Sequence, residues 1–432
     1  MVCAIALLLV DRAFHCMKIE ADPAALGSGP LPRGWIIVGC LWFVAGLNYL
    51  DRIVITTVRS SLVEAIPMSE ADFGFLTSIF LFVYGGFSPF AGFLADRFSR
   101  SGVIVVSVFL WSAITWLTSQ ATTYNELVLA RAAMGLTEAC YIPAALALIV
   151  DYHRGNTRTF ATGLHQSGIS VGSSLGGVGG VLAQSHGWAY PFQIFGLIGI
   201  VYSLFLVMVV RDPPKPKVID APSEKAQHVD FWDALRHLLT NSRFLLLVAC
   251  VSCLGLAGWA MIGWMPTHLQ EQFGLSQGKA GMIATSYMHI AGFAGCLLGG
   301  FFTDLWMRKD PRARMYLPLI GLGIAAPGIV LAGTSTVLLF SIVGLVAYGM
   351  CRHFADTNLM PILCIVADSR YRATGYGIMN FCSCMVGGIG IYAGGMIRDA
   401  KVNVSIVFQV AGLGLLVAGF FIWWIRPVER TH

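Results

Sequence analysis

Apolar residues fill long stretches of this chain, and polar residues gather in the shorter segments between them. A helix needs about 20 consecutive apolar residues to cross the hydrocarbon core of a bilayer. The stretches reach that length, so each predicts a membrane-spanning helix. Twelve are expected, at residues 35–58, 73–95, 101–119, 124–150, 160–184, 188–210, 243–264, 278–303, 314–333, 336–364, 372–396 and 403–425. The pattern therefore predicts an all-α membrane protein.

The longest polar interruption lies near the middle of the chain and leaves six expected spans on each side. It predicts a leader at 1–33, a six-helix bundle at 34–210, a linker at 211–242, a second six-helix bundle at 243–426 and a tail at 427–432. The halves also share short motifs. Gly92 and Gly300 each stand four residues before an aspartate, and Thr-Gly recurs at 162–163 and 374–375. Repeats at nearly equal offsets favour a duplicated unit, so we expect two pseudo-symmetric bundles.

Charge composition changes this picture by giving it an orientation. Only 12% of the residues are charged, against about 25% in soluble domains. If the amino terminus is inside, only Arg59, Lys279, Arg398 and Lys401 fall in outer loops. Positive residues accumulate in cytoplasmic loops, so we expect a multi-pass protein of the plasma membrane, the inner membrane in a bacterium, with both termini cytoplasmic. The net charge of +5 follows from this asymmetry, so no nucleic-acid partner is expected.

Several chemistries are disfavoured by what the polar segments contain. They carry no nucleophile–base pair, metal-ligand cluster or nucleotide motif, so we expect neither an enzyme nor a cofactor or metal site. Cys250-x-x-Cys253 has no second pair or nearby histidine, and packing is favoured over a redox or metal role. Glycines recur at 168, 172, 176 and 180 in the fifth expected span, which predicts close approach of a neighbouring helix.

Two expected spans carry charged residues. Asp51 and Arg52 lie near the far end of the first span, and Arg131 and Glu138 lie seven apart, on one face of the fourth. An unpaired charge at the bilayer centre costs about 2.5–3.5 kcal/mol. The spans run in opposite directions, which brings Asp51 and Arg52 to roughly the depth of Arg131. Static buried salt bridges are one interpretation. A shared polar cavity is favoured, because buried ion pairs contribute little net stability.

The segment Gly92–Arg100 resembles the loop between the second and third helices of the major facilitator superfamily, whose pattern is Gly-x-x-x-Asp-Arg/Lys-x-Gly-Arg/Lys. Gly92, Asp96, Arg97 and Arg100 match it, and Ser99 replaces the usual glycine. The resemblance extends over about residues 33–428. It implies alternating access between the bundles, with a gate network at Asp96, Arg97 and Arg100 that holds the outward-facing state and Asp304 as its reduced counterpart.

Within that superfamily, Asn48-Tyr49-Leu50-Asp51-Arg52 together with Arg131 and Glu138 resembles the anion:cation symporters, which take up sugar acids and other organic anions with protons. A similar opening occurs in spinster-like lipid carriers. The resemblance therefore implies proton-coupled symport of a small organic anion, with a carrier of lysolipid or another amphiphile as the alternative. A receptor that transports nothing would not need Asp51 and Glu138.

These residue types suit such transport chemically. A guanidinium holds a carboxylate through two parallel hydrogen bonds, so Arg52 or Arg131 is the expected anion ligand. Asp51 and Glu138 are the candidate proton carriers, because burial favours the neutral carboxyl and a nearby arginine favours the ionised one. Substrate that reaches an arginine would release its carboxylate partner to take a proton. Which arginine contacts substrate stays open.

The second half adds Arg352 and His353 in the tenth expected span. Arg352 and Asp356 are four apart and could pair along one helix face. Alternatively Arg352 or His353 binds the other end of a substrate with two anionic groups. Further candidate cavity residues are Tyr49, Tyr84, Gln166 and Asn380, each equally compatible with a hydrogen bond between helices. The expected partners are a small organic anion, protons and the lipid bilayer, and the chain is expected to act as a monomer.

Overall fold

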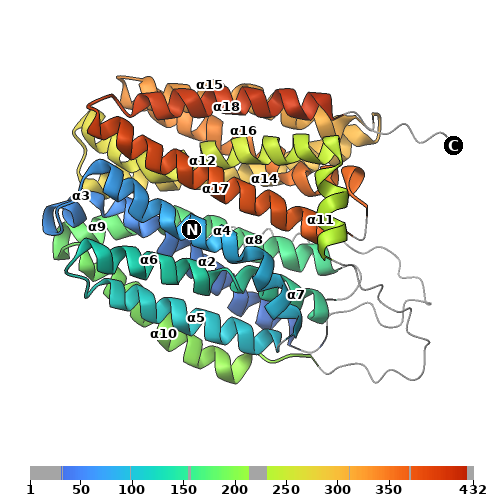
Figure 1. Cartoon of the computed structure of the whole chain (residues 1–432), viewed down its shortest axis with the longest axis horizontal. Helices are drawn as coiled ribbons and strands as arrows, with labels where there is room; N and C mark the ends of the chain where they lie inside the picture. The colour runs from blue at the N-terminus through green and yellow to red at the C-terminus, as the bar shows by residue number, and fades with distance from the viewer. Residues whose placement is uncertain are drawn as a thin grey trace, which may run out of the picture.

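The computed structural model describes residues 31, 33–97, 99–153, 157–213, 231–310, 312–368 and 371–425, without the side chains at 89, 92–97, 158–159, 231, 234 and 373. Of the predicted leader, linker and tail, residues 1–30, 32, 214–230 and 427–432 lie outside this part. All the elements within it are helices. The long helices lie side by side along the longest axis of the molecule (Figure 1).

The first half of the chain forms nine helices within the described residues. They are α2 (Gly34–Thr57), α3 (Arg59–Ala65), α4 (Glu70–Arg97), α5 (Arg100–Thr118), α6 (Tyr124–Glu138), α7 (Tyr141–Tyr152), α8 (Arg158–Leu175), α9 (Gly177–His186) and α10 (Ala189–Val209). We call this part the N-terminal half.

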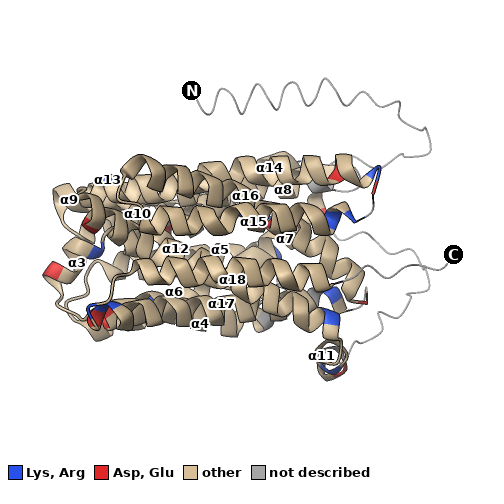
Figure 2. Cartoon of the chain, turned by 90° about the horizontal axis from the view of Figure 1, so that it is seen from above, with Lys and Arg blue, Asp and Glu red and all other residues tan. Residues whose placement is uncertain are grey.

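The C-terminal half forms the remaining elements. They are α11 (Phe231–Leu239), α12 (Ser242–Phe273), α13 (Gln277–Met282), the π-helical segment η2 (Ile283–Tyr287), α14 (Met288–Met307), α15 (Ala313–Thr334), α16 (Leu338–Val366), α17 (Arg372–Asp399) and α18 (Ser405–Trp424). The short α11 runs across one end of the long helices (Figure 1) and is seen end-on at that end in Figure 2.

Eleven segments of the described residues are long and apolar enough to cross a membrane. They correspond to eleven of the twelve expected spans. The twelfth, expected at 160–184, is also helical but consists of α8 and α9, which meet at Gly176 and are rich in glycine and serine. Charged residues gather at the two ends of the helical body and are few in its middle (Figure 2), as a bilayer favours.

Local sequence explains where several helices begin. The Thr123 hydroxyl accepts the N–H of Glu126, whose carboxylate accepts the N–H of Thr123, and this capping box starts α6. The Asn241 side chain accepts the N–H groups of Arg243 and Phe244 and starts α12. These caps satisfy amide groups that have no partner within the helix.

Glycines bring α8 against α2, as their spacing predicted. A Cβ atom at Gly172 would lie 1.9 Å from the carbonyl oxygen of Gly46, and one at Gly168 would lie 2.4 Å from that of Trp42. Any side chain at these positions would force the helices apart. The two helices are thus in backbone contact beside the residues of α2 that carry charge.

The two halves meet along α4 and α17. The Ser78 hydroxyl of α4 donates to the carbonyl oxygen of Gly388 at 2.7 Å. A second contact joins α9 to α13, where a Cβ atom at Gly177 would lie 2.6 Å from the Cα of Met282. Helices from both halves are therefore in direct contact at these two places.

Candidate functional site

Four charged side chains from α2 and α6 form a buried group, which we call the central charged cluster: Asp51, Arg52, Arg131 and Glu138. Their exposed fractions are 2%, 4%, 2% and 0%. Arg52 Nε donates to Glu138 Oε2 at 2.6 Å. The two predicted pairs of charges thus meet in one place. The sequence had put Arg52 at roughly the depth of Arg131, but its side chain contacts Glu138.

Aromatic rings surround the Arg52 guanidinium. The Cζ atom of Arg52 lies 4.7 Å from the ring centre of Tyr49, 5.2 Å from that of Phe80 and 4.3 Å from that of Tyr84. Such rings attract a cation through their negative faces. Of the residues predicted for the cavity, Tyr49 and Tyr84 therefore lie at Arg52, and Phe80 was missed because apolar rings are common throughout the spans.

Arg131 and Asp51 differ from the Arg52–Glu138 pair because no ion pair joins either of them to another described side chain. Arg131 Nη1 donates to the Met134 sulfur at 3.2 Å, and its guanidinium lies 4.8 Å from the ring centre of Phe80. The Thr115 hydroxyl lies 3.5 Å from Asp51 Oδ2, and Asp51 Oδ1 has no hydrogen-bond partner in the part of the chain that the structure describes. Arg131 and Asp51 therefore interact electrostatically with each other and with Glu138, but neither is held in a close ion pair.

The C-terminal half contributes a second group, Arg352, His353 and Asp356 of α16, which we call the Arg352 group. Arg352 Nη1 lies 3.4 Å from Asp356 Oδ2, and His353 Nε2 lies 3.8 Å from the same oxygen. Arg352 and Asp356 thus lie together along one helix face, as one of the two interpretations left open had it. These side chains are 19%, 21% and 28% exposed, so they are more accessible than the central charged cluster.

The other predicted cavity residues are dispersed. Gln166 is exposed on α8. Asn380 Nδ2 donates to the Ser88 hydroxyl at 3.1 Å and so joins α17 to α4, which is the interhelical hydrogen bond that remained an alternative for it. Neither residue contacts the central charged cluster through a hydrogen bond.

Of the predicted gate residues, Asp96 and Arg97 end α4 and Arg100 begins α5. The side chains of Asp96 and Arg97 are outside the described part of the structure. Arg100 Nη1 pairs with Asp151 of α7 and also donates to the Ala147 carbonyl oxygen at 3.2 Å. Asp304 is exposed near the end of α14. The Asp151 partner was not expected, because it lies in another helix and outside the loop motif.

A further charged group lies at the opposite end of α4, and sequence reasoning missed it. This Arg398 cluster consists of Arg59, Glu70, Glu271, Arg398 and Asp399. Arg398 Nε donates to Glu70 Oε2 at 2.9 Å, while its terminal nitrogens donate to both Glu271 oxygens at 2.8 and 2.6 Å. Arg59 also pairs with Glu70. The Asp399 carboxylate accepts the N–H groups of Glu70 and Ala71, each at 2.9 Å.

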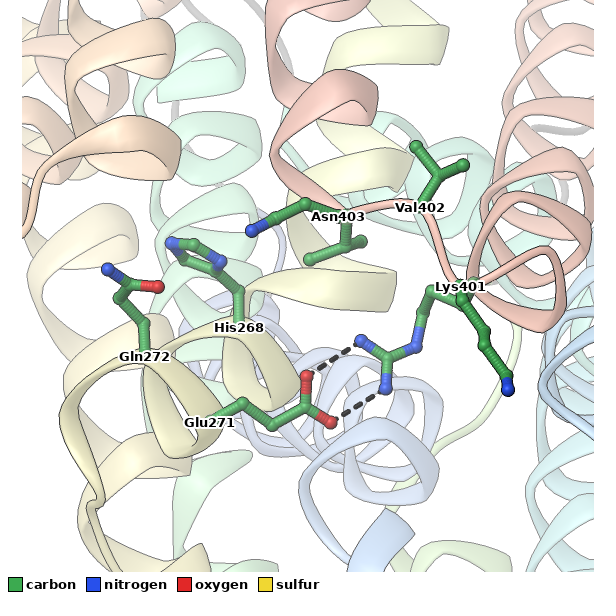
Figure 3. Close-up of a pocket in the computed structure, with 8 residues that line it drawn as sticks. His268, Glu271, Gln272, Lys401, Val402 and Asn403 are labelled. Atoms are coloured by element: carbon green, nitrogen blue, oxygen red, sulfur yellow. Dashed lines mark hydrogen bonds and ion pairs between the residues drawn. The ribbon is translucent and has the colours of Figure 1, made fainter.

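The Arg398 cluster borders a surface pocket of about 360 Å³. Figure 3 shows Glu271 at its wall with two hydrogen bonds to the arginine, and His268, Lys401 and Asn403 around the opening. Because Glu70 belongs to the N-terminal half and Arg398 to the C-terminal half, the cluster ties the two halves together at this end.

Comparison with known proteins matches this chain to a family. Residues 41–391 match the family described as Major Facilitator Superfamily. Protein spinster of Drosophila melanogaster is 26% identical over 302 residues, which cover 68% of this chain and 49% of that protein. This chain therefore spans about half the length of that relative.

Two bacterial relatives differ in what their names describe. An MFS-type efflux pump of Mycolicibacterium smegmatis is 26% identical over 394 residues, 89% of each chain. A probable galactarate/D-glucarate transporter of Bacillus subtilis is 27% identical over 302 residues, 64% of this chain and 66% of its own.

A solved structure shares the fold. It is that of a bacterial homolog to the human lysosomal transporter Spinster, in an inward-facing and occupied conformation. Its TM-score is 0.76 at 22% sequence identity, over 92% of this chain and 97% of that one.

Proposed function

The chain belongs to the Major Facilitator Superfamily and is a transporter of that fold, and we propose that it carries a small organic anion together with protons. The observation that supports this proposal is the buried pair of Arg131 and Asp51, which have no ion-pair partner among the described side chains. Arg131 offers a fixed cation and Asp51 a carboxyl group that can bind a proton.

Electrostatics couple the two ligands. A carboxylate that binds Arg131 adds a negative charge beside Asp51, and a proton on Asp51 removes one. Each ligand therefore strengthens the binding of the other, and this mutual effect is the linkage that symport requires. Arg52 is already neutralised by Glu138 at 2.6 Å, so we assign the anion to Arg131. Glu138 becomes available for a proton only when substrate draws Arg52 away.

The substrate class proposed is a sugar acid or similar carboxylate. The name of the Bacillus subtilis relative, a probable galactarate/D-glucarate transporter, supports this choice. We further propose uptake across a bacterial inner membrane by a monomer with cytoplasmic termini, in which segments 34–210 and 243–426 rock against each other. Because the Arg398 cluster joins the two halves at the end opposite Arg100, it then closes the outer side.

A carrier of lysolipid or another amphiphile is the second candidate. It is supported by the spinster relative and by the aromatic rings of Phe80 and Tyr84 beside Arg52. In that case the anionic headgroup would bind Arg52, and an acyl chain would lie along apolar side chains.

Thermal unfolding of the purified protein separates these candidates. Galactarate at about 100 times its dissociation constant should stabilise the native state by about 2.7 kcal/mol. Arg131→Ala should abolish this stabilisation. Arg131→Lys should weaken it, because an ammonium group cannot make two parallel hydrogen bonds to a carboxylate. Lys401→Gln, which removes an exposed positive charge, is the matched control. Stabilisation by lysophosphatidylcholine alone would refute the sugar-acid proposal.

A further inference from the structure

We propose that His353 and Asp356 form a second proton-binding site in the C-terminal half, so that a substrate with two carboxylates is carried together with two protons. The inference rests on the proposed anion transport. It changes the role of His353 from substrate ligand to proton carrier, and it fixes the ratio of protons to substrate, which the central charged cluster alone does not.

The hydrogen bond of His353 to its own helix determines which ring nitrogen is available. Nδ1 lies 2.6 Å from the carbonyl oxygen of Gly349. A carbonyl oxygen only accepts hydrogen bonds, so Nδ1 must carry the proton there. In the neutral ring the other nitrogen, Nε2, then has a lone pair, and it faces Asp356 Oδ2 at 3.8 Å.

A lone pair opposite a carboxylate oxygen is an unfavourable contact, and one proton removes it. With a proton on Nε2, the imidazolium and the carboxylate become an ion pair. The Nδ1 hydrogen bond holds the ring in place, and so does Gly292 of α14, where a Cβ atom would lie 2.5 Å from His353 Cε1. The ring therefore has little freedom to turn Nε2 away from Asp356.

Arg352 competes with this proton for the same oxygen, because its Nη1 lies 3.4 Å from Asp356 Oδ2. A substrate carboxylate that draws Arg352 away would leave Asp356 without a cation, and His353 would then take up a proton. Tyr348 of the same helix interacts with the Arg352 group, and so do the titratable groups of neighbouring elements, which are Tyr49 of α2, Cys250 of α12, His289 and Cys296 of α14 and Tyr376 of α17. None of these six groups is a carboxylate, so Asp356 is the acidic partner of His353 in this set.

The two sites balance the substrate charge in the same way. Ionised Arg131 and Asp51 sum to zero, and so do ionised Arg352 and Asp356. Each pair remains neutral when it accepts one carboxylate and one proton. A dicarboxylate bound between Arg131 and Arg352 would thus cross with two protons and no net charge.

Proteoliposomes loaded with valinomycin and potassium test this, with galactarate as the probe. A pH gradient should drive accumulation by the wild-type protein, and an inside-negative potential should leave it unchanged. His353→Asn should carry one net negative charge per cycle, so a potential of about 100 mV should lower its accumulation about fifty-fold. The asparagine preserves the hydrogen bond to the helix, as Asn358 of α16 shows by donating to the Phe354 carbonyl oxygen at 2.9 Å.

Proton uptake on binding provides a readout that does not require transport. Calorimetry of galactarate binding in buffers of different ionisation enthalpy should show fewer protons taken up by His353→Asn than by the wild type. Absence of pH-driven galactarate accumulation by the wild type would contradict the proposed function. If the wild type accumulates galactarate as expected but His353→Asn shows the same voltage response and proton uptake, the second proton site is wrong and the proposed function stands.

Discussion

Replacing Arg398 with glutamine should weaken the contact between the two halves at the Arg398 cluster. Arg398 makes three hydrogen bonds, but two of them go to Glu271 of α12, within its own half. Only the bond from Nε to Glu70, at 2.9 Å, crosses to the N-terminal half. The variant therefore removes one charged contact that exists only when this end is closed.

The size of the effect follows from burial. The Arg398 side chain is 13% exposed and that of Glu70 is 24% exposed. A hydrogen bond to a charged group contributes about 1.5–3 kcal/mol, and an exposed ion pair about 0.2–1 kcal/mol. Arg59 still pairs with Glu70 in the variant. We therefore expect a shift toward the open end of about 1–2 kcal/mol, which is about a 5- to 30-fold change in the equilibrium constant.

Hydrogen–deuterium exchange reports this opening at named amides. The N–H groups of Glu70 and Ala71 donate to Asp399 in the closed arrangement, and opening exposes them to water. Arg398→Gln should accelerate their exchange by the same 5- to 30-fold. Glu271→Gln is the matched control, because it removes bonds within one half and should leave these amides nearly unchanged. Equal acceleration in both variants, or none in either, would refute the assignment of the cross-half contact.

Two further predictions concern stability. Glu138→Ala leaves Arg52 buried without its anion and should lower the free energy of unfolding by about 3–5 kcal/mol. Glu138→Gln should cost less because it keeps a hydrogen-bond acceptor. Equal thermal stability of Glu138→Ala and the wild type would contradict the buried ion pair of Arg52 and Glu138. Gly172→Ala places a Cβ 1.9 Å from the Gly46 carbonyl oxygen and should cost at least about 1–3 kcal/mol. Gly39→Ala, where no atom lies within 4 Å of the added Cβ, should be tolerated, and similar melting temperatures for both alanine variants would argue against the α2–α8 contact.

Much of the fold could be predicted because length and apolarity determine which segments cross a bilayer. The interruptions inside spans could not. The break between α6 and α7 falls at Ala139 and Cys140, where Pro143 lacks the N–H that would donate to the Ala139 carbonyl oxygen. A proline alone does not predict such a break, because Pro361 lies inside the continuous α16. The break between α8 and α9 falls at Gly176, but other glycines in the same stretch cause no break. Nothing in the sequence of Ile283–Tyr287 indicates a π-helical turn. These features depend on packing between helices, which a single span does not specify.

The site could be predicted in its residue types and only partly in its pairings. Charges inside spans are costly, so Asp51, Arg52, Arg131 and Glu138 were conspicuous. That Arg52 reaches Glu138 depends on the direction of a long side chain, which depth along a helix does not determine. Arg398 and Glu70 are 328 positions apart. Their contact depends on how the two halves are placed together, and the sequence revealed only that Arg398 lies near the end of a span.

The most direct test of the coupling between Arg131 and Asp51 is galactarate transport by Asp51→Asn in proteoliposomes. The asparagine has nearly the same shape as aspartate but cannot gain or lose a proton. The variant should exchange external for internal galactarate, yet a pH gradient should drive much less accumulation than in the wild type. Accumulation by Asp51→Asn that responds to the pH gradient as strongly as the wild type would contradict the role of Asp51 as a proton carrier.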